Sequence, residues 1–442
     1  MDLIEKQLLN KKNQMKQIDE KISSEQITPT SSEKRTLQNI IRSISSQYRK
    51  ELTDSTTDRH ILNDKIKNTI HYEIEKLNVD YEDKKRMEKL ALANIIGLGP
   101  LQQYLDDPSI TEIIVQRYDN ICVEREGKVY SVKAVFSDEE NLMNIINRIL
   151  QPVGREVNKS TPIVDAHLED GSRICATIPP VSPKGATLTI RKFNNAMMTA
   201  QKYIELGSLS PKMLQLLRIC VLGKVSIYVS GGTGTGKTTF LNMLSAFLPG
   251  DELIITIEDT LELQLKQKNV RALETRPIVN GSMESVDMAS LVKASLRMRP
   301  NRIIVGETRD GAIVSLLTAM STGHEGSMST GHANSPENLV NVRIPTMMEM
   351  DKTTTFSERA QALMIAEAIE LIVQLRRLPD GRRVVSQITE ISGIKNHRII
   401  LTDIFRYNHG TDKFEYTGNF PQRIADHLAL SLYPIDKNFF TI

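Results

Sequence analysis

The chain has 442 residues, and its 56 lysines and arginines nearly balance its 54 aspartates and glutamates, for a formal net charge of +2. This balance gives no overall electrostatic basis for binding nucleic acid, so any basic surface would have to be local. Apolar residues make up 40% of the chain and charged residues 25%, which argues against a wholly disordered protein. The length predicts two or three structural units.

The three cysteines, Cys122, Cys175 and Cys220, are odd in number and form no CxxC pair. This pattern disfavours a disulfide framework or a zinc site and fits a reducing cytoplasm. The first residues, MDLIEKQLLNKKNQ, are charged and contain no apolar signal core. The most apolar stretches, such as residues 219–229, are much shorter than a membrane span. We therefore expect a cytoplasmic protein that is not integral to a membrane, although a partner could dock it on one.

Residues 1–85 are rich in Lys, Glu, Gln, Asn and Ser and are predicted to form a helical N-terminal extension. Apolar residues recur there at helical spacing, namely at Ile4, Leu8, Met15, Ile18 and Ile22. A Thr-Pro-Thr-Ser-Ser segment interrupts this pattern, and a second helical stretch covers residues 33–50. The extension is either a coiled-coil or partner-docking arm, or a charged helical segment that packs on its own protein.

Residues 86–195 are predicted to form a smaller α/β N-terminal domain. A helix ends at Gly-Leu-Gly-Pro, a β-rich strand covers residues 110–115, and a helix covers residues 141–150. Two further β segments, RICATIPPV and ATLTIRKF, complete this domain. Residues 196–206 are predicted to be a linker.

Residues 207–442 are predicted to form a second α/β domain. A helix over residues 211–222 precedes a strand over residues 225–230, and strands, loops and helices then alternate. This alternation is typical of a parallel sheet covered by helices. Several alternating runs within residues 371–405 predict antiparallel strands at the edge of that sheet.

The string GGTGTGKT matches the phosphate-binding pattern GxxxxGK[ST] and lies between a predicted strand and a predicted helix. Glycines let the backbone wrap a phosphate, the lysine places a charge on the β and γ phosphates, and the final hydroxyl reaches Mg²⁺. The motif therefore predicts that ATP and Mg²⁺ are the cofactors, with Thr238 as a metal ligand. The predicted nucleotide-binding residues are Gly231, Gly232, Thr233, Gly234, Thr235, Gly236, Lys237, Thr238 and the following Thr239.

Two acidic segments follow predicted strands downstream of this P-loop. LIITIED ends in Glu258 and Asp259, and RIIVGETRD contains Glu307. Because open α/β sheets bind ligands at the carboxyl ends of their strands, both segments belong near the phosphates. In such sites one carboxylate lies beside Mg²⁺ and one polarises the attacking water. We predict catalytic roles for Glu307 and Glu258, with Glu258 also a metal ligand.

Two histidines, His324 and His332, lie among small residues in TGHEGS and STGHANS. Such loops are typical of segments close to a ligand, where a histidine could bond the γ-phosphate. The alternative for each is a structural histidine bonded to the backbone. A zinc site is disfavoured because no cysteine accompanies them.

Four arginines are candidates for the cations that stabilise charge on a γ-phosphate. Arg173 and Arg191 lie on β segments of the first domain, whereas Arg297 and Arg299 precede the strand of Glu307. For a single arginine, the alternative is a solvated or salt-bridged side chain.

Together these motifs resemble the secretion ATPases of type II and type IV secretion systems and type IV pili. The strings that carry the resemblance include DPSITEIIV, VDAHLEDGSRICATIPPV, TLTIRKF, GGTGTGKTT, SLRMRPNRIIVGETRDG and AMSTGHEGSMSTGHANSP. They extend from about residue 90 to residue 405 and are most similar to the Flp/Tad-pilus assembly ATPases (CpaF-like).

The resemblance implies a homohexameric ring of RecA-like P-loop NTPase domains, each with an N-terminal domain that closes over ATP. It assigns Glu258 to an acidic box, Glu307 to Walker B and His332 to a histidine box. It also implies that Arg173 and Arg191 reach the nucleotide from the N-terminal domain. The implied partner is an inner-membrane platform protein, which would hold the ATPase peripherally at the cytoplasmic face and use its motion for pilus assembly or secretion.

Two residues depart from the family's pattern. Thr308 stands where an apolar residue is expected, and Gly331 replaces a bulkier residue before His332. The four-cysteine zinc module of some type II relatives is absent from the sequence, which favours the Flp/Tad or type IV branch.

Two other functions compete with a secretion or pilus motor. A nucleic-acid-directed hexameric P-loop motor shares the same motifs, but the near-neutral charge, the absence of Trp and the lack of clustered aromatic and basic residues disfavour it. Direct binding of nucleic acid is therefore not expected. An ATP-binding scaffold that does not hydrolyse is disfavoured by the presence of Glu258 and Glu307.

Overall fold

A computed structural model gives the structure of the chain, which divides into two compact units, Met1–Asn194 and Asn195–Ile442. The residues that the structure describes are 31–48, 50–51, 59–125, 128–168, 170–193, 198–276, 285–351 and 354–440. The proposed apolar seam from Ile4 to Ile22 lies outside them. Within the described residues, none of the helices combines the length and the apolar character needed to cross a bilayer.

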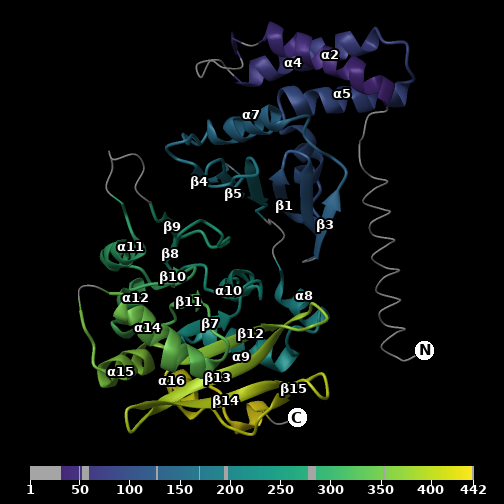
Figure 1. Cartoon of the computed structure of the whole chain (residues 1–442). Coiled ribbons are helices and arrows are strands. Elements are labelled where there is room, and N and C mark those ends of the chain that lie inside the picture. The colour runs from purple at the N-terminus through teal and green to yellow at the C-terminus, as the bar shows by residue number, and fades with distance from the viewer. Residues whose placement is uncertain are drawn as a thin grey trace. The chain divides into compact units, whose positions relative to one another are not determined.

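Three helices begin the described part of the first unit (Figure 1). They are α2 (Ser31–Gln47), α4 (Arg59–Glu75) and α5 (Tyr81–Ile95). The spacing of four residues between Ile66, Ile70 and Ile74 places them on one face of α4, where they are buried against α2 and α5. The arginine side chain of Arg148 then donates to the Ile95 carbonyl at 2.6 Å, which caps the end of α5. These helices thus pack on the chain's own residues.

The rest of the first unit is an antiparallel sheet of six strands in the order β3-β2-β1-β6-β5-β4. Helix α7 is capped by Asp138, which accepts from the Asn141 amide, and it buries an apolar face in the same core as the strands. The elements are α6 (Gln102–Asp106), β1 (Ile110–Arg117), β2 (Asn120–Arg125), β3 (Lys128–Val132), α7 (Glu139–Leu150), β4 (Ile163–His167), β5 (Arg173–Thr177) and β6 (Thr187–Arg191).

The second unit contains a sheet of nine strands in the order β15-β14-β13-β12-β7-β11-β10-β8-β9. Strands β12, β7, β11, β10, β8 and β9 are parallel, and β13, β14 and β15 extend the sheet beyond β12, each antiparallel to the strand before it. The strands are β7 (Ile227–Gly231), β8 (Ile254–Glu258), β9 (Val270–Glu274), β10 (Arg302–Val305), β11 (Met328–Gly331), β12 (Leu371–Arg377), β13 (Arg383–Lys395), β14 (Arg398–Asn408) and β15 (Lys413–Tyr416).

Helices cover both faces of this sheet. Successive residues of a strand point to opposite faces, so neighbouring apolar residues of its buried strands pack against different helices. Ile227 and Val229 of β7 pack with α8, α9, α10 and α16, whereas Tyr228 packs with α11, α12, α14 and α15. Figure 1 shows α12, α14 and α15 beside these strands in green. The helices are α8 (Ala200–Glu205), α9 (Pro211–Leu222), α10 (Lys237–Ser245), α11 (Met288–Ser295), α12 (Ala312–Ser321), α13 (Pro336–Asn338), α14 (Ile344–Glu349), α15 (Glu358–Ala368) and α16 (Gln422–Ala429).

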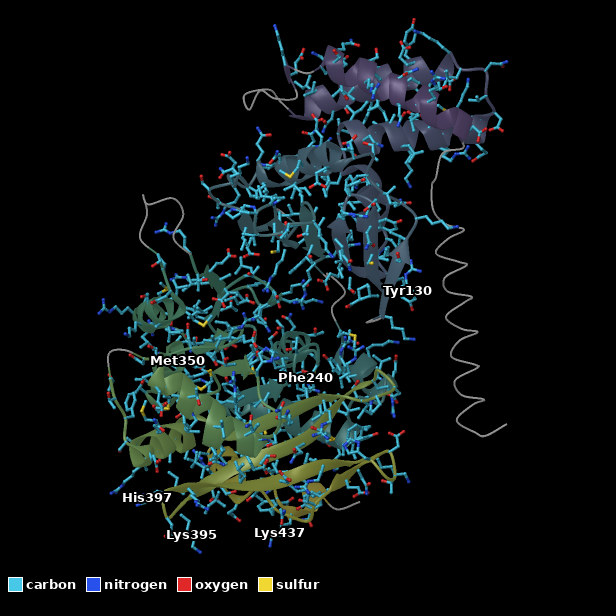
Figure 2. All side chains as sticks on the ribbon, in the orientation of Figure 1. Tyr130, Phe240, Met350, Lys395, His397 and Lys437 are labelled. Atoms are coloured by element: carbon cyan, nitrogen blue, oxygen red, sulfur yellow. The ribbon has the colours of Figure 1, made fainter. Side chains whose placement is uncertain are left out.

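The residues predicted to be a linker contain helix α8. Its Tyr203 is buried and packs edge-on against Phe240 of α10, with ring centroids 5.4 Å apart (Phe240 is labelled in Figure 2). This segment therefore anchors on the helix that follows the P-loop. The predicted α/β fold class is confirmed, with a P-loop domain, a smaller α/β domain and a helical extension.

Candidate active site

The P-loop follows the carboxyl end of β7, which lies between β11 and β12 in the middle of the sheet. Strands β10 and β8 run in the same direction, two and three positions away from β7 respectively. The loops after β8, β10 and β11 therefore leave the sheet at the same edge as the P-loop, here called the carboxyl edge. Glu258 is the last residue of β8, and the loops after β10 and β11 carry Glu307 and His332, as an open α/β sheet predicts for a ligand site.

The P-loop has the backbone geometry of a phosphate cradle. Gly234 and Gly236 have φ angles of 72° and 89°, which L side chains adopt only with strain. The Thr235 hydroxyl donates to the Gly232 carbonyl at 2.8 Å and closes the turn. Helix α10 begins at Lys237, so its free amino-terminal N–H groups lie where the loop ends. The cradle thus offers an anion backbone donors and the helix dipole.

Three predicted site residues meet beside this cradle. The Lys237 ammonium lies 3.3 Å from His332 Nδ1 and 3.8 Å from Glu307 Oε1. His332 Nε2 lies 2.8 Å from the same Glu307 oxygen. Arg309 donates from Nε to the other oxygen, Glu307 Oε2, at 2.9 Å. The structure therefore brings together one carboxylate, one lysine, one arginine and one histidine at the carboxyl edge.

The electrostatics of this group favour an added anion. Burial lowers the pKa of Lys237, and burial together with the neighbouring Lys237 charge lowers the pKa of His332. Glu307 Oε1 is buried and accepts no hydrogen bond from the described residues, despite its short contact with His332. A triphosphate would favour the charged form of Lys237, and a water molecule could use the unsatisfied oxygen. The residues present thus fit a nucleotide with its bound cation.

An open pocket of about 200 Å³ borders Glu307. Its lining includes Asp259, Arg309 and Asp310, which come from the loops after β8 and β10. The Thr275 hydroxyl donates to Asp259 at 3.2 Å and ties the end of β9 to this lining. The pocket gives water a route to the Glu307 carboxylate.

Glu258 has a different environment from Glu307. Its side chain is 3% exposed, and its Oε1 accepts from the backbone amides of Glu262 and Leu263 at 2.9 and 3.0 Å. Asn242 of α10 accepts from the Gln264 amide at 2.8 Å, so the same loop is fastened to the P-loop helix. In this arrangement Glu258 fixes the loop after β8. Glu258 also presents carboxylate oxygens, which are the ligands that Mg²⁺ prefers, at the carboxyl end of β8.

The structure separates the two histidines. Strand β11 runs between them, so His332 follows its carboxyl end while His324 precedes its amino end. The interpretation of both loops as close to the phosphates is therefore wrong for His324, whose carbonyl accepts from Ser327 at 2.7 Å. Arg297 and Arg299 also precede the first residue of their strand, β10. They lie at the amino edge of the sheet, away from the P-loop.

Arg173 and Arg191 lie in the first unit, on β5 and β6. The two residues are direct cross-strand neighbours in the register, and Glu112 of β1 stands opposite Arg191 on the other side. Like charges directly opposite each other are unfavourable unless an anion lies near them. The predicted pair is thus brought together on one strip of the N-terminal sheet.

Sequence reasoning missed Arg383, the first residue of β13. Its Nε donates to the carbonyl of Gly234 at 2.9 Å, and its Cδ lies over Gly236. The neighbouring Arg382 is instead held by Asp380 and Asp412. Arg383 is 149 residues from Gly234, and the one available signal is the Pro-Asp-Gly sequence at residues 379–381, which is typical of a turn and lies within the run of predicted antiparallel strands.

The chain is similar in sequence to known proteins. A family model described as "Type II/IV secretion system protein" matches residues 95–400. Conjugal transfer protein TrbB of Rhizobium radiobacter is 32% identical over 302 residues, which are 66% of this chain and 87% of that protein. A solved structure of the VirB11 ATPase from the Brucella suis type IV secretion system is 28% identical and covers 66% of this chain and 95% of its own, with a TM-score of 0.37.

An uncharacterised protein of Methanocaldococcus jannaschii is 41% identical over 245 residues, which are 53% of this chain. The chain spans only 34% of that relative. The family match covers more than half of this chain and includes the P-loop, Glu307 and His332. The predicted resemblance to the secretion ATPase superfamily is confirmed, and the chain belongs to the type II/IV secretion system protein family.

Proposed function

We propose that this chain is an ATP-hydrolysing motor that acts as a homohexamer on an inner-membrane platform protein. The observation that carries the proposal is the meeting of Lys237, Glu307 and His332 beside the P-loop. Family membership supports a role in secretion, conjugal transfer or pilus assembly. Within that range, the motif strings quoted above support the Flp/Tad-pilus branch and a peripheral position at the cytoplasmic face of the membrane.

In the proposed reaction, the P-loop amides and Lys237 bind the β and γ phosphates. Glu307 orients the attacking water through Oε1, the oxygen that accepts no hydrogen bond from the described residues. His332 lies between Lys237 and Glu307, so it can bond the γ-phosphate and respond to its loss. Binding and orientation therefore come from side chains that the fold already holds in place.

Mg²⁺ would neutralise charge on the phosphates when bound. Thr238, in the first turn of α10, and Glu258, at the end of β8, are the proposed protein ligands. The cross-strand pair Arg173 and Arg191 is proposed to bring positive charge to the nucleotide from the N-terminal domain. The motif strings quoted above, together with the cross-strand placement of the two arginines, support this role.

The deciding experiment compares Glu307→Gln with the wild type. We expect ATP to bind to the variant while turnover falls about 100-fold or more, because the amide cannot accept the proton of the attacking water. Phosphate release and equilibrium binding of ATP with Mg²⁺ measure the two effects. Glu349→Gln is a matched control, since Glu349 is an exposed acid at the end of α14. Near-normal turnover in Glu307→Gln would remove that residue from the reaction.

The alternative, a nucleic-acid-directed motor, can be distinguished from this proposal by the molecule that stimulates ATP hydrolysis. We expect the cytoplasmic domain of a platform protein to stimulate ATP hydrolysis and single-stranded DNA to have no effect. Stimulation by single-stranded DNA alone would favour the alternative. A purified protein that binds no ATP would rule out both motors.

A further inference from the structure

Tyr228 is a fully buried tyrosine at the second position of β7, three residues before the P-loop begins. Its hydroxyl lies 2.5 Å from the Thr308 hydroxyl. A buried phenol is costly unless it forms a hydrogen bond, so this contact specifies where both side chains lie. Thr308 directly follows Glu307 in the chain.

Thr308 is itself 1% exposed and is fastened to the neighbouring strand. Its amide donates to the Thr330 carbonyl at 2.9 Å, at the end of β11. The Thr330 hydroxyl in turn donates to the Gly306 carbonyl at 2.7 Å. The backbone on either side of Glu307 is thus bonded to the residue two positions before His332.

Gly331, directly before His332, borders the same tyrosine. A Cβ added to Gly331 would overlap the Tyr228 hydroxyl oxygen and lie 3.0 Å from the ring atoms Cε1 and Cζ. A side chain at position 331 and the tyrosine hydroxyl therefore exclude each other. The two departures from the family's pattern, Thr308 and Gly331, have one explanation, because both accommodate the hydroxyl of Tyr228.

We propose that Tyr228 is a positioning residue for Glu307 and His332. Its hydroxyl bonds the Thr308 side chain and lies against Gly331, and so sets the 2.8 Å approach of His332 Nε2 to Glu307 Oε1. Tyr228 is fully buried and acts through its two neighbours. The inference rests on the proposed function only in that Glu307 is taken to act on the attacking water.

The first test removes the Tyr228 hydroxyl and, separately, its partner hydroxyl on Thr308. Tyr228→Phe keeps the buried ring and removes only the hydrogen bond, so we expect the protein to fold, with a kcat about tenfold lower and an ATP dissociation constant within about twofold of the wild type. Thr308→Val should have the same effect because it removes the partner hydroxyl at equal volume. Thr308→Ser keeps the hydroxyl and should restore turnover.

A double-mutant cycle tests whether the two hydroxyls act as one unit. We expect Tyr228→Phe with Thr308→Val to be no slower than either single variant, because each change already breaks the same bond. Fully additive losses would overturn the bridge. An unchanged kcat in Tyr228→Phe, or equal losses of kcat and ATP affinity, would overturn the positioning role.

Gly331 provides a reciprocal test. Gly331→Ala should lower kcat, and adding Tyr228→Phe should recover part of the loss, because the overlapping oxygen is removed while the ring atoms at 3.0 Å remain. No recovery in the double variant would contradict the steric argument. Urea unfolding midpoints of all variants show whether a change in kcat reflects global stability.

A nucleotide-free measurement separates this inference from the proposed function. The ring Cε1–H signal of His332 in NMR, assigned with His332→Gln, should move in Tyr228→Phe and stay in place in Thr308→Ser. If the wild type hydrolysed no ATP, the proposed function would fail while this signal still tested the bridge. A signal unmoved by Tyr228→Phe would overturn the bridge even in an active enzyme.

Discussion

The two edges of the parallel sheet in the second unit use charge in opposite ways. At the amino edge, Arg302 has no exposed surface, binds Glu252 through Nε at 2.5 Å and Nη2 at 3.2 Å, and donates to the Val221 carbonyl at 2.7 Å. At the carboxyl edge, Glu307 keeps one buried oxygen without a hydrogen bond from the described residues, and burial lowers the pKa of Lys237.

The two edges differ in how completely their buried charged groups are satisfied by partners. Buried charges at the amino edge have their partners within the chain, so they hold strands and helices together. Those at the carboxyl edge are close to each other but incompletely satisfied, which costs stability and suits a ligand. The edges therefore predict different phenotypes: loss of stability at the amino edge and loss of activity at the carboxyl edge.

The largest effect is expected for Lys237→Ala. Hydrolysis should be abolished, because the ammonium that meets the phosphates is removed, while the free energy of unfolding should change by less than about 1 kcal/mol. Phosphate release, ATP binding and urea unfolding measure these quantities. Lys293→Ala, an exposed lysine on α11, is the control. A large loss of stability with retained turnover would reverse the assignment of this edge.

Arg302→Ala tests the amino edge. We expect it to lower the free energy of unfolding by about 3 kcal/mol, because it breaks a buried ion pair and two carbonyl contacts. The loss should be moderated by Lys224, which stays 3.8 Å from Glu252. Urea unfolding measures this loss of free energy of unfolding. The KM for ATP of the folded enzyme should be unchanged. The exposed Arg297→Ala on the same edge should cost less than about 0.5 kcal/mol.

A smaller effect is expected for Arg383→Ala at the carboxyl edge. Loss of the bond to the Gly234 carbonyl should raise the KM for ATP about three- to tenfold, with little change in kcat, because one hydrogen bond orders the P-loop. Arg382→Ala is the matched control, since Arg382 binds Asp380 and Asp412 instead. Equal KM values in the two variants would remove Arg383 from the site.

The smallest effect is a pH dependence at the amino edge. His427 of α16 lies 2.6 Å from Glu370, which also accepts from the Ser226 amide at the start of β7, and the pair raises the pKa of His427. The stabilisation is complete below pH 6.5 and is lost as the pH rises through the folded pKa. Unfolding midpoints of His427→Gln and the wild type should therefore differ at pH 6 and converge at higher pH.

The control for this pH series is His397→Gln, since His397 is exposed in the turn between β13 and β14 (labelled in Figure 2). The unfolding midpoint of His397→Gln should equal that of the wild type at each pH. Glu325 also favours the protonated form of His427. The pH-dependent difference between His427→Gln and the wild type therefore reports on both carboxylates together. A difference between His427→Gln and the wild type that does not vary with pH would exclude the ion pair as its cause.

Much of the site could be predicted from the sequence because its signals are local. The P-loop pattern lies between a strand and a helix, and the loops of Glu307 and His332 follow parallel strands. The sequence does not separate the loop of His324 from that of His332, because β11 is only four residues long, too short for its period to be recognised. Once that strand is placed, the seven residues between the histidines must cross the sheet.

The contacts that sequence reasoning missed all depend on strand order. Arg383 reaches Gly234 because β13 pairs with β12, and β12 pairs with β7. Tyr228 meets Thr308 across β11, although 80 residues separate them in the chain. Propensity and spacing do not give the order of strands in a sheet, so such partners are invisible before the fold is known.

The central position of β7 has a consequence for biosynthesis. Its two neighbours, β11 and β12, begin about 100 and 140 residues later in the chain. While the ribosome is still producing those residues, the strand that carries the P-loop has unpaired backbone on both sides and is open to non-native pairing. The nucleotide cradle is thus one of the last parts of the molecule to mature, and a product terminated before Leu371 would leave it at an exposed sheet border.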